Sequence, residues 1–469
     1  MRRRLCAASV LLGLAGAGVR MTAESAEPKE IRFMTLDPGH FHAALVLREA
    51  QAGVAKKVDV YAPLGPDLLD HLTRITRFNT RKSSPTAWEV EAHTGPDFLE
   101  RMLKERPGNA VVLSGKNRGK IDRLQASLDG GIHALVDKPW ILDAADMPKL
   151  ERALATAETK GLVAYDIMTE RYEVSSELQR ELVNDRAVFG TQLPGSPAEP
   201  AVYMESVHHL KKVVDGVPNM RPAWFFDAAL QGEGINDIGT HLVDLVQWTL
   251  HPDQAIDYKK DAKVLAAQRW ATAIPEAEFR SVTGVAFPPE LAASVKDGVL
   301  QYFCNGLVSY TLRGVHVGLN VIWDWEPPAG AGDTHFAFYK GSRARIEVRQ
   351  GKAERYRTEL YVVPVSPADK SALLTAVNAT LERVRARYPG TSAVDAGAEI
   401  RIQVPDALRI SHEEHFGQVA QRFLQYVRDR KTLPAWERPN MLAKYFVTTE
   451  GMTLARRGEP RVAERRAPR

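Results

Sequence analysis

The stretch IRFMTLDPGHFH, residues 31–42, decides the fold of this 469-residue chain. It is a short apolar run that ends in a turn, and a helical pattern continues from the turn to Gln51. Further short apolar runs follow at 58–61, 110–113, 134–136 and 162–166, with helical patterns between most of them. Short buried strands that alternate with helices are typical of a parallel, doubly wound sheet. We therefore predict an α/β Rossmann-type domain over residues 30–168.

The pattern changes in the second half of the chain. Strand-like stretches recur at 299–312, 314–323, 335–339, 344–349 and 358–363, with turn residues between them. Such closely spaced stretches predict a large, mainly antiparallel sheet in an α+β domain over residues 169–455. Helical patterns at 370–388, 411–430 and 441–455 belong to the same domain. The Arg-, Pro- and Ala-rich residues 456–469 predict a disordered basic tail.

The first 25 residues are typical of an export signal. Three arginines at positions 2–4 precede a fifteen-residue apolar run, and residues 23–25 fit a cleavage site. The run is too short to span a bilayer, so we expect no membrane attachment once the leader is removed. Adjacent arginines allow a twin-arginine signal, with a general secretory signal as an equal alternative. The prediction is a periplasmic or secreted protein; a start at Met21, giving a cytoplasmic one, ranks lower.

Composition and charge exclude several classes of protein. Hydrophobic residues make up 44% and the mean hydropathy is −0.27, which excludes a disordered or multi-span membrane protein. The net charge of +4 is carried by the two ends of the chain, so no basic face for a nucleic acid is expected. Of two cysteines, Cys6 lies in the leader and Cys304 remains alone, which excludes an internal disulfide and a cysteine-based metal cluster.

The first turn departs from the dinucleotide-binding pattern G-x-G-x-x-G, because residues 37–42 read DPGHFH. Only Gly39 remains, at the position where the backbone approaches a diphosphate. Asp37 places a carboxylate near the same position, and the second strand lacks a terminal acid for a ribose. By itself this turn indicates a weak dinucleotide site, or a degenerate one. His40 and His42 lie where a ligand must pass, so we expect contact with substrate or cofactor.

Two further segments carry side chains suited to acid–base chemistry. The segment GIHALVDKP, residues 131–139, ends a strand with Asp137 and Lys138. In GEGINDIGTHLVD, residues 232–244, Asp237, His241 and Asp244 are spaced i, i+4 and i+7, on one face of a helix. A histidine flanked by two carboxylates has a positioned tautomer and a raised affinity for a proton. The alternative interpretation is a helix cap with a structural histidine.

These segments resemble the glucose–fructose oxidoreductase / inositol dehydrogenase / rhizopine-catabolism (Gfo/Idh/MocA) family. Its E-K-P turn is matched by residues 137–139, with Asp for Glu. Its G-G-x-x-x-D-x-G-x-H-x-x-D helix is matched at Gly234, Asp237, Gly239, His241 and Asp244. Asn117 is similar to the asparagine of its T-P-N turn. The resemblance implies that Lys138, Asp237 and His241 are catalytic, and that NAD or NADP, either exchanging or permanently bound, contacts Gly39, His40, Phe41, Asn117, Asp137 and Lys138.

The resemblance also implies oxidation of a hydroxyl, or reduction of a carbonyl, on a sugar or polyol. His241 would take the hydroxyl proton with help from Lys138, while Asp237 would hold the imidazole and another substrate hydroxyl. We expect His208 and Trp224 to contact the sugar as well, with a surface role for His208 and a core position for Trp224 as the alternatives. One alternative is isomerisation, elimination or glycoside cleavage through a transient keto-sugar with recycled NAD. Another is a non-catalytic carbohydrate-binding protein.

We expect no metal site in this chain, and we expect the chain to form a homo-oligomer. His412 and His415 are spaced i, i+3 and lack the H-E-x-x-H pattern, so a capped helix start is favoured over a metal site. A sheet domain with one exposed face often pairs with a copy of itself, which favours a homo-oligomer.

Overall fold

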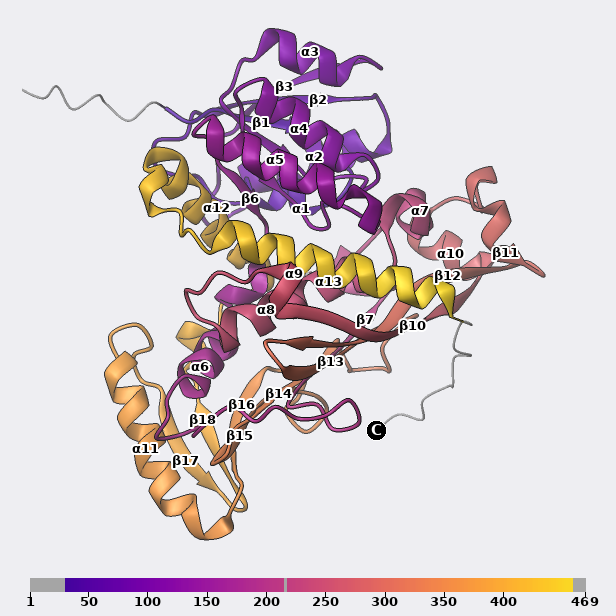
Figure 1. Cartoon of the computed structure of the whole chain (residues 1–469). Helices are drawn as coiled ribbons and strands as arrows, with labels where there is room; N and C mark the ends of the chain where they lie inside the picture. The colour runs from indigo at the N-terminus through magenta and orange to yellow at the C-terminus, as the bar shows by residue number, and fades with distance from the viewer. Residues whose placement is uncertain (1–29, 215–216, 459–469) are drawn as a thin grey trace, which may run out of the picture.

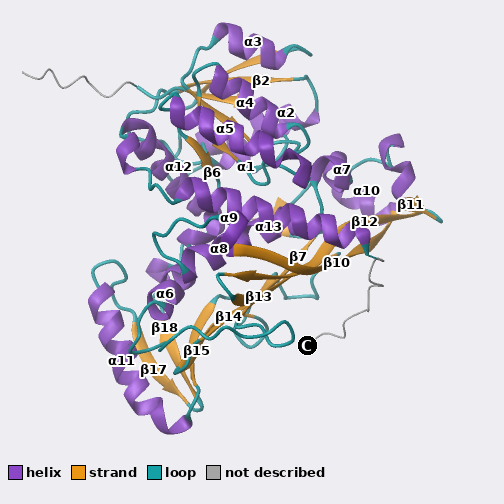
Figure 2. Ribbon diagram, viewed as in Figure 1, coloured by secondary structure: helices purple, strands orange, loops and turns teal. Residues whose placement is uncertain are grey.

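The computed structural model describes residues 30–214 and 217–458, which form two domains with a long helix between them (Figure 1). The predicted export signal and residues 459–469 of the predicted tail lie outside the described residues. Figure 2 shows that helices and strands alternate in the first domain, whereas one large sheet dominates the second.

The first domain is a six-stranded parallel sheet with the strand order β3-β2-β1-β4-β5-β6. This is the doubly wound order, and ligands of such sheets bind at the carboxyl ends of the strands where the order reverses, here between β1 and β4. The predicted Rossmann-type domain is thus confirmed. The elements are β1 Phe33–Leu36, β2 Lys57–Ala62, β3 Glu89–Thr94, β4 Ala110–Leu113, β5 His133–Val136 and β6 Ala164–Asp166, with α2 Pro66–Thr80, α3 Phe98–Glu105, α4 Lys120–Asp129 and α5 Met147–Thr159.

The helix predicted from the first turn to Gln51 is much shorter in the structure. It is the four-residue helix α1, His42–Leu45. The next backbone bonds, from Leu47 to Ala44 and from Arg48 to Leu45, span only three residues, so the chain continues in turns. Residues 43–47 are all buried, which gave the segment its helical pattern.

The second domain contains the sheet order β10-β12-β13-β7-β14-β15-β16-β18-β17, with β11 beside β12. Its pairs are antiparallel except for the parallel pair β7 and β13, which confirms the predicted mainly antiparallel sheet. The strands are β7 Val202–His209, β10 Ala262–Pro275, β11 Val295–Lys296, β12 Val299–Leu312, β13 Val315–Asp324, β14 Thr334–Lys340, β15 Ala344–Gln350, β16 Glu359–Pro364, β17 Ser392–Ala396 and β18 Glu399–Gln403; β8 Val213–Val214 and β9 Val217–Pro218 form a separate pair.

Strand β10 escaped prediction because its burial does not alternate. It is interrupted by two register shifts against β12, so neither face of the strand is consistently apolar. The helices of this domain are α6 Val174–Val183, α7 Ala228–Gln231, α8 Gly234–Leu250, α9 Tyr258–Asp261, α10 Glu276–Thr283, α11 Lys370–Val384, α12 His412–Arg428 and α13 Glu437–Arg457.

Helix α8 is buried almost throughout its length and packs on β12, β13 and α13. Its first residue must be glycine, because a Cβ at Gly234 would lie 2.1 Å from the carbonyl oxygen of Cys304. The close approach fixes the start of α8 against the sheet and thereby the direction of its first turns, which carry Asp237 and His241.

The last two helices return to the first domain. Phe416 and Phe423 of α12 are fully buried in the first domain's core, where Phe423 stacks on Phe33 of β1 at 6.3 Å. Helix α13 includes Arg456, which we had placed in a disordered tail, and this side chain bonds Asp143 and Glu233 at 2.7 and 2.9 Å. The tail prediction is therefore wrong at its first residues. Of the helices in the two described ranges, none has the length and apolar character to cross a membrane.

Candidate functional site

A cavity of about 470 Å³ lies where the turns after β1 and β5 meet helix α8 and the second sheet. Seven of the chain's thirteen histidines line it, a concentration that core packing does not explain. They come from the first turn, α8, β7, β14 and the start of α12: His40, His42, His208, His241, His335, His412 and His415. Of the residues predicted for the site, the cavity brings together His40, Phe41, Lys138, His208, Asp237 and His241.

Lys138 and Asp237 form a buried ion pair at the wall of this cavity. Lys138 follows β5, and Asp237 lies in the first turn of α8, so the pair joins the two domains. Burial alone would raise the pKa of Asp237, but the charge and hydrogen bond of Lys138 outweigh it and lower that pKa. The carboxylate is therefore ionised and holds the ammonium group beside the cavity.

His241 lies one helical turn beyond Asp237 and also lines the cavity. Its Nδ1 atom is buried and has no hydrogen-bond partner among the described residues. Burial and the nearby charge of Lys138 hold the pKa of His241 well below its ordinary value, so the ring is neutral near pH 7. We had expected two flanking carboxylates to raise its affinity for a proton, which is wrong: no hydrogen bond joins His241 to Asp237 or Asp244.

Asp244 has a different set of partners. It accepts two hydrogen bonds from Arg171, at 2.6 and 2.7 Å, and one from Lys444 at 3.1 Å. Arg171 also bonds Glu437 at 2.8 Å, and Lys444 pairs with Asp166 at 2.8 Å. All five side chains are buried, so this network ties α8 to α13 and to β6. Asp244 thus has a structural role.

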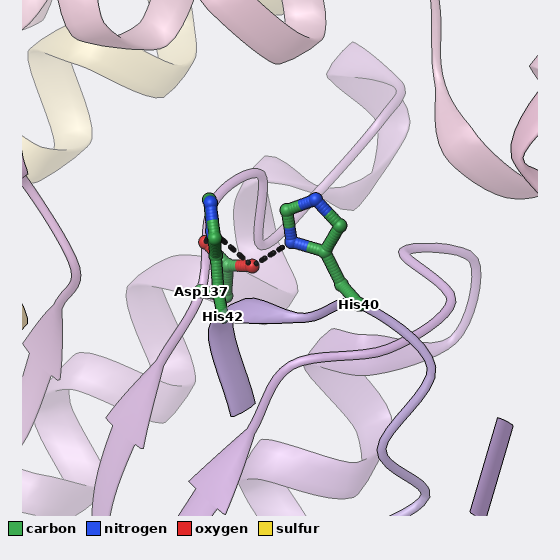
Figure 3. Close-up of side chains that lie close together, drawn as sticks. All are labelled: His40, His42 and Asp137. Atoms are coloured by element: carbon green, nitrogen blue, oxygen red, sulfur yellow. Dashed lines mark hydrogen bonds and ion pairs between the residues drawn. The ribbon is translucent and has the colours of Figure 1, made fainter. Parts of the chain in front are cut away.

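Asp137 is the centre of a third cluster, at the first turn (Figure 3). His40 Nδ1 lies 2.9 Å from Asp137 Oδ2, and His42 Nδ1 lies 3.1 Å from the same oxygen and 3.2 Å from Oδ1. The Ser114 hydroxyl donates to Oδ2 as well, at 2.8 Å. Burial and the neighbouring His40 lower the pKa of His42 to about 3. The pKa of Asp137 is also well below its usual range, because these two histidines outweigh its burial.

Gly39 does not face open space. A Cβ at this residue would lie 2.9 Å from the ring of Trp224 and 3.0 Å from a carboxylate oxygen of Asp67. The indole N–H of Trp224 donates to the same Asp67 carboxylate at 2.8 Å. Trp224 therefore covers the first turn and does not line the cavity, where we had expected it. The aromatic wall is supplied by Phe225 and Trp323.

Asn117 also lies outside the cavity. Its amide donates to the main-chain oxygen of Gln231 at 2.6 Å, and its own oxygen accepts a hydrogen bond from Lys120. Asp37 is paired with Arg123 at 2.8 Å. The turn after β4 is therefore packed against α7, which ends at Gln231.

Several cavity residues escaped prediction because they lie far apart in the chain, in strands and loops without a motif. Asp333 is one: it bonds His209 at 2.9 Å and Lys212 at 2.7 Å beside the cavity. His412 is another. The capping box of Ser411 and Glu414 that starts α12 confirms the predicted capped helix, yet His412 also lines the cavity. A helix-start signal by itself does not tell what the helix start faces.

Comparison with known proteins agrees with this architecture. The family model described as "Putative oxidoreductase C terminal domain" matches residues 178–456. A solved oxidoreductase structure from Parabacteroides merdae ATCC 43184 is 46% identical, with a TM-score of 0.89 over 92% of this chain and 98% of that one. A search of curated proteins found no match.

More distant structures share the fold. GenD2 from gentamicin A biosynthesis, in complex with NAD, is 15% identical with a TM-score of 0.55, covering 95% of this chain and 97% of that one. The WlbA dehydrogenase from Bordetella pertussis, in complex with NADH and UDP-GlcNAcA, is 13% identical with a TM-score of 0.53, covering 92% and 96%. The family model and the 46% identical structure establish that the chain belongs to the oxidoreductases with this C-terminal domain, and its two-domain fold with the Lys138, Asp237 and His241 set is of the Gfo/Idh/MocA type.

Proposed function

We propose that the protein acts on a sugar or polyol in this cavity, at a carbon that bears a hydroxyl or carbonyl oxygen. One observation carries the proposal: the Lys138 ammonium, fixed by Asp237, lies on the same cavity wall as the neutral imidazole of His241. A cavity of about 470 Å³ is in the size range of small-molecule sites. The sugar-nucleotide complex of the related WlbA supports the substrate class.

Lys138 and His241 have different roles in the proposed reaction. Lys138 donates a hydrogen bond to the reacting oxygen and stabilises negative charge that develops there. His241 is neutral, so its imidazole accepts a proton from the substrate and returns it in the reverse step. Asp237 keeps the ammonium in place and makes no side-chain hydrogen bond to His241. Such a positioned proton-transfer group contributes roughly 10²- to 10⁴-fold to a rate.

The family implies NAD or NADP as hydride carrier, and the first turn is where its diphosphate would lie. The residues there do not fit it in the described conformation. The Trp224 ring and the Asp67 carboxylate cover Gly39, and Asp37 adds a second carboxylate close by. The indole N–H is already engaged with Asp67 and the Arg123 guanidinium with Asp37, so the two carboxylates occupy the donors that a diphosphate would need. No step is therefore derived through a nicotinamide.

The covered turn favours a second candidate function without net redox change. A substrate that already carries a carbonyl requires only proton transfer for isomerisation, or for elimination of a neighbouring group including a glycosidic oxygen. Lys138 on the carbonyl oxygen and His241 as base would supply both parts of that reaction.

Product analysis separates the candidates. The purified protein is incubated with a panel of sugars, polyols and keto-sugars, with and without added NAD or NADP, and its denatured supernatant is assayed for nicotinamide by mass spectrometry. Net reduction of added NAD or NADP supports the oxidoreductase, whereas cleavage or isomerisation without nicotinamide supports the second candidate. Binding of sugars without turnover would instead favour a carbohydrate-binding protein and contradict both.

Export and self-association remain proposals of their own. The arginines and apolar run of residues 1–25 support export, which cell fractionation with mature N-terminal sequencing would test.

The half-buried rings of Tyr203, Phe336 and Phe338 lie together in the second sheet, at centroid distances of 5.8–6.4 Å, and support pairing through that face. Light scattering on the purified protein would give the oligomeric state.

A further inference from the structure

The first turn carries a constellation that neither acid–base chemistry nor a dinucleotide uses. His40 and His42 form an H-x-H pair directly after β1, and Asp137 is the first residue after β5. Strands β1, β4 and β5 are neighbours in the parallel sheet, so their carboxyl ends converge. The fold therefore brings two imidazoles and a carboxylate together from positions almost 100 residues apart.

The geometry of these three groups is that of ligands around one ion. Their ligand atoms all lie within 4.8 Å of one another, and both imidazole nitrogens lie 2.9–3.1 Å from Asp137 Oδ2. Zn²⁺ binds nitrogen and oxygen at about 2.0–2.2 Å, which places neighbouring ligand atoms about 3 Å apart. Figure 3 shows the ring nitrogens of His40 and His42 directed at the same carboxylate.

The carboxylate is held by contacts of the kind that orient metal ligands. The Ser114 hydroxyl donates to Asp137 Oδ2 at 2.8 Å, and the buried Lys120 ammonium donates to the main-chain oxygen of Asp137 at 2.8 Å. Such outer contacts fix the direction of a ligating carboxylate. The Lys138 ammonium is paired with Asp237 across the cavity wall, which leaves Asp137 with its two histidines.

The open side of the cluster faces the cavity. His40 and His42 both line it, and so does His241, whose buried Nδ1 has no partner among the described residues. Three protein ligands with an open position are the arrangement of catalytic metal sites, in which water or substrate takes the remaining position. Two imidazoles and one carboxylate suit Zn²⁺, Fe²⁺, Co²⁺ or Mn²⁺ better than Mg²⁺ or Ca²⁺.

We propose that His40, His42 and Asp137 bind one divalent transition-metal ion at the wall of the cavity. Binding of the ion is independent of the proposed function. Its use, to polarise the substrate oxygen together with Lys138, rests on that function.

A second group of side chains offers a matched control. Asp59, Glu91 and His93 also place one ligand atom each within 4.8 Å of the others, on β2 and β3. There the Lys57 ammonium already pairs with Glu91 at 2.5 Å, and none of the three residues lines the cavity. His93→Ala removes a histidine from this second group, which has one histidine and two carboxylates, without touching the first turn.

The experiment uses the full mature chain without a histidine tag, because a tag binds the same ions. The protein is dialysed against a chelator, then titrated with Zn²⁺ and Co²⁺, and bound metal is measured by elemental mass spectrometry. Wild type and His93→Ala are expected to bind one ion per chain, and Co²⁺ to show visible absorption bands of a nitrogen- and oxygen-ligated site. His42→Ala and the double variant His40→Ala/His42→Ala are expected to bind at least 100-fold more weakly, with circular dichroism confirming that they fold.

Two results would overturn the proposal. One is a folded wild-type protein that binds no ion at micromolar Zn²⁺ or Co²⁺; the other is an unchanged stoichiometry in a folded His40→Ala/His42→Ala variant. Loss of the ion in His93→Ala with retention in the double variant would place the metal at β2 and β3, and also contradicts it. Metal content does not depend on turnover, so failure of the proposed function leaves this test intact.

Discussion

Asp237 and Asp244 lie on one face of helix α8, two turns apart, yet their surroundings differ completely. Asp237 has a single charged partner, Lys138, at the edge of a cavity. Asp244 accepts three hydrogen bonds from two buried cations and has no contact with the cavity. The comparison teaches that spacing along a helix places side chains on one face, whereas their partners decide which of them does chemistry and which holds the fold.

Replacing the cation at the cavity should produce the largest effect. We expect Lys138→Met to lower kcat/KM by about 10²- to 10⁴-fold, since it removes the group that stabilises charge on the substrate oxygen. The unfolding free energy should fall as well, because the buried Asp237 carboxylate loses its ion-pair partner, so the catalytic effect is read from kcat/KM of the folded fraction. Steady-state kinetics and urea unfolding measure the two quantities. Wild-type kcat/KM in Lys138→Met would mean that the Lys138–Asp237 pair has no part in the chemistry.

Replacing Asp244, the second carboxylate, should lower stability and leave activity nearly unchanged. Asp244→Asn leaves the charges of Arg171 and Lys444 short of a partner in a buried network, so we expect a loss of about 3–5 kcal/mol in unfolding free energy. The activity of the molecules that remain folded should be close to that of wild type. Thermal and urea unfolding, with activity assayed well below the transition, test both parts. Wild-type stability in this variant would contradict the structural role of Asp244.

The dependence of stability on pH separates the two regions further. The folded-state pKa of His241 is well below that of the unfolded chain, so the unfolded state binds a proton first as the pH falls below about 6.5. Stability from this residue is thus lost on acidification, by up to about 1.4 kcal/mol per pH unit. Asp244 has a lowered pKa, because Arg171 and Lys444 outweigh its burial, and its contribution is lost only below about pH 4.

Unfolding curves of His241→Asn between pH 6.5 and 5 should accordingly fall less steeply than those of wild type. Asp244→Asn is the control and should give a curve parallel to wild type in this range, at a lower level. Equal slopes for His241→Asn and wild type would mean that the pKa of His241 is not lowered in the folded protein.

The smallest expected effect concerns the cover over the first turn. Gly39→Ala places a Cβ 2.9 Å from the Trp224 ring, so we expect it to destabilise the fold by at least about 1 kcal/mol. In a Trp224→Ala background the same substitution should cost less, because the ring that it meets is gone. A double-mutant cycle of unfolding free energies measures the coupling. Additive effects would mean that Trp224 does not rest on Gly39 in solution.

The sequence could predict the spacing of side chains along an element, but it could not predict their partners from other parts of the chain. Period and motif were enough for the class of both sheets, though not for strands β3 and β10, and for the strand end that carries Asp137 and Lys138 and the helix that carries His241. They could not reveal that Arg171 and Lys444 reach Asp244, since those residues lie 73 and 200 positions away from it. For the same reason the place of Trp224 over Gly39 was not predicted: a single aromatic residue before a helix is compatible with a sugar wall and with a cover.

The central claim is that His241 transfers a proton while Lys138 stabilises charge on the substrate oxygen, and for a substrate that carries a carbonyl it is tested most directly by isotope exchange. A panel of keto-sugars is incubated with the protein in D₂O, and deuterium on the carbon next to the carbonyl is followed by NMR. We predict that wild type accelerates the exchange for at least one sugar, and that Lys138→Met and His241→Asn, both folded, lose about 10²-fold or more of that acceleration. Exchange at the wild-type rate in both variants would contradict the account.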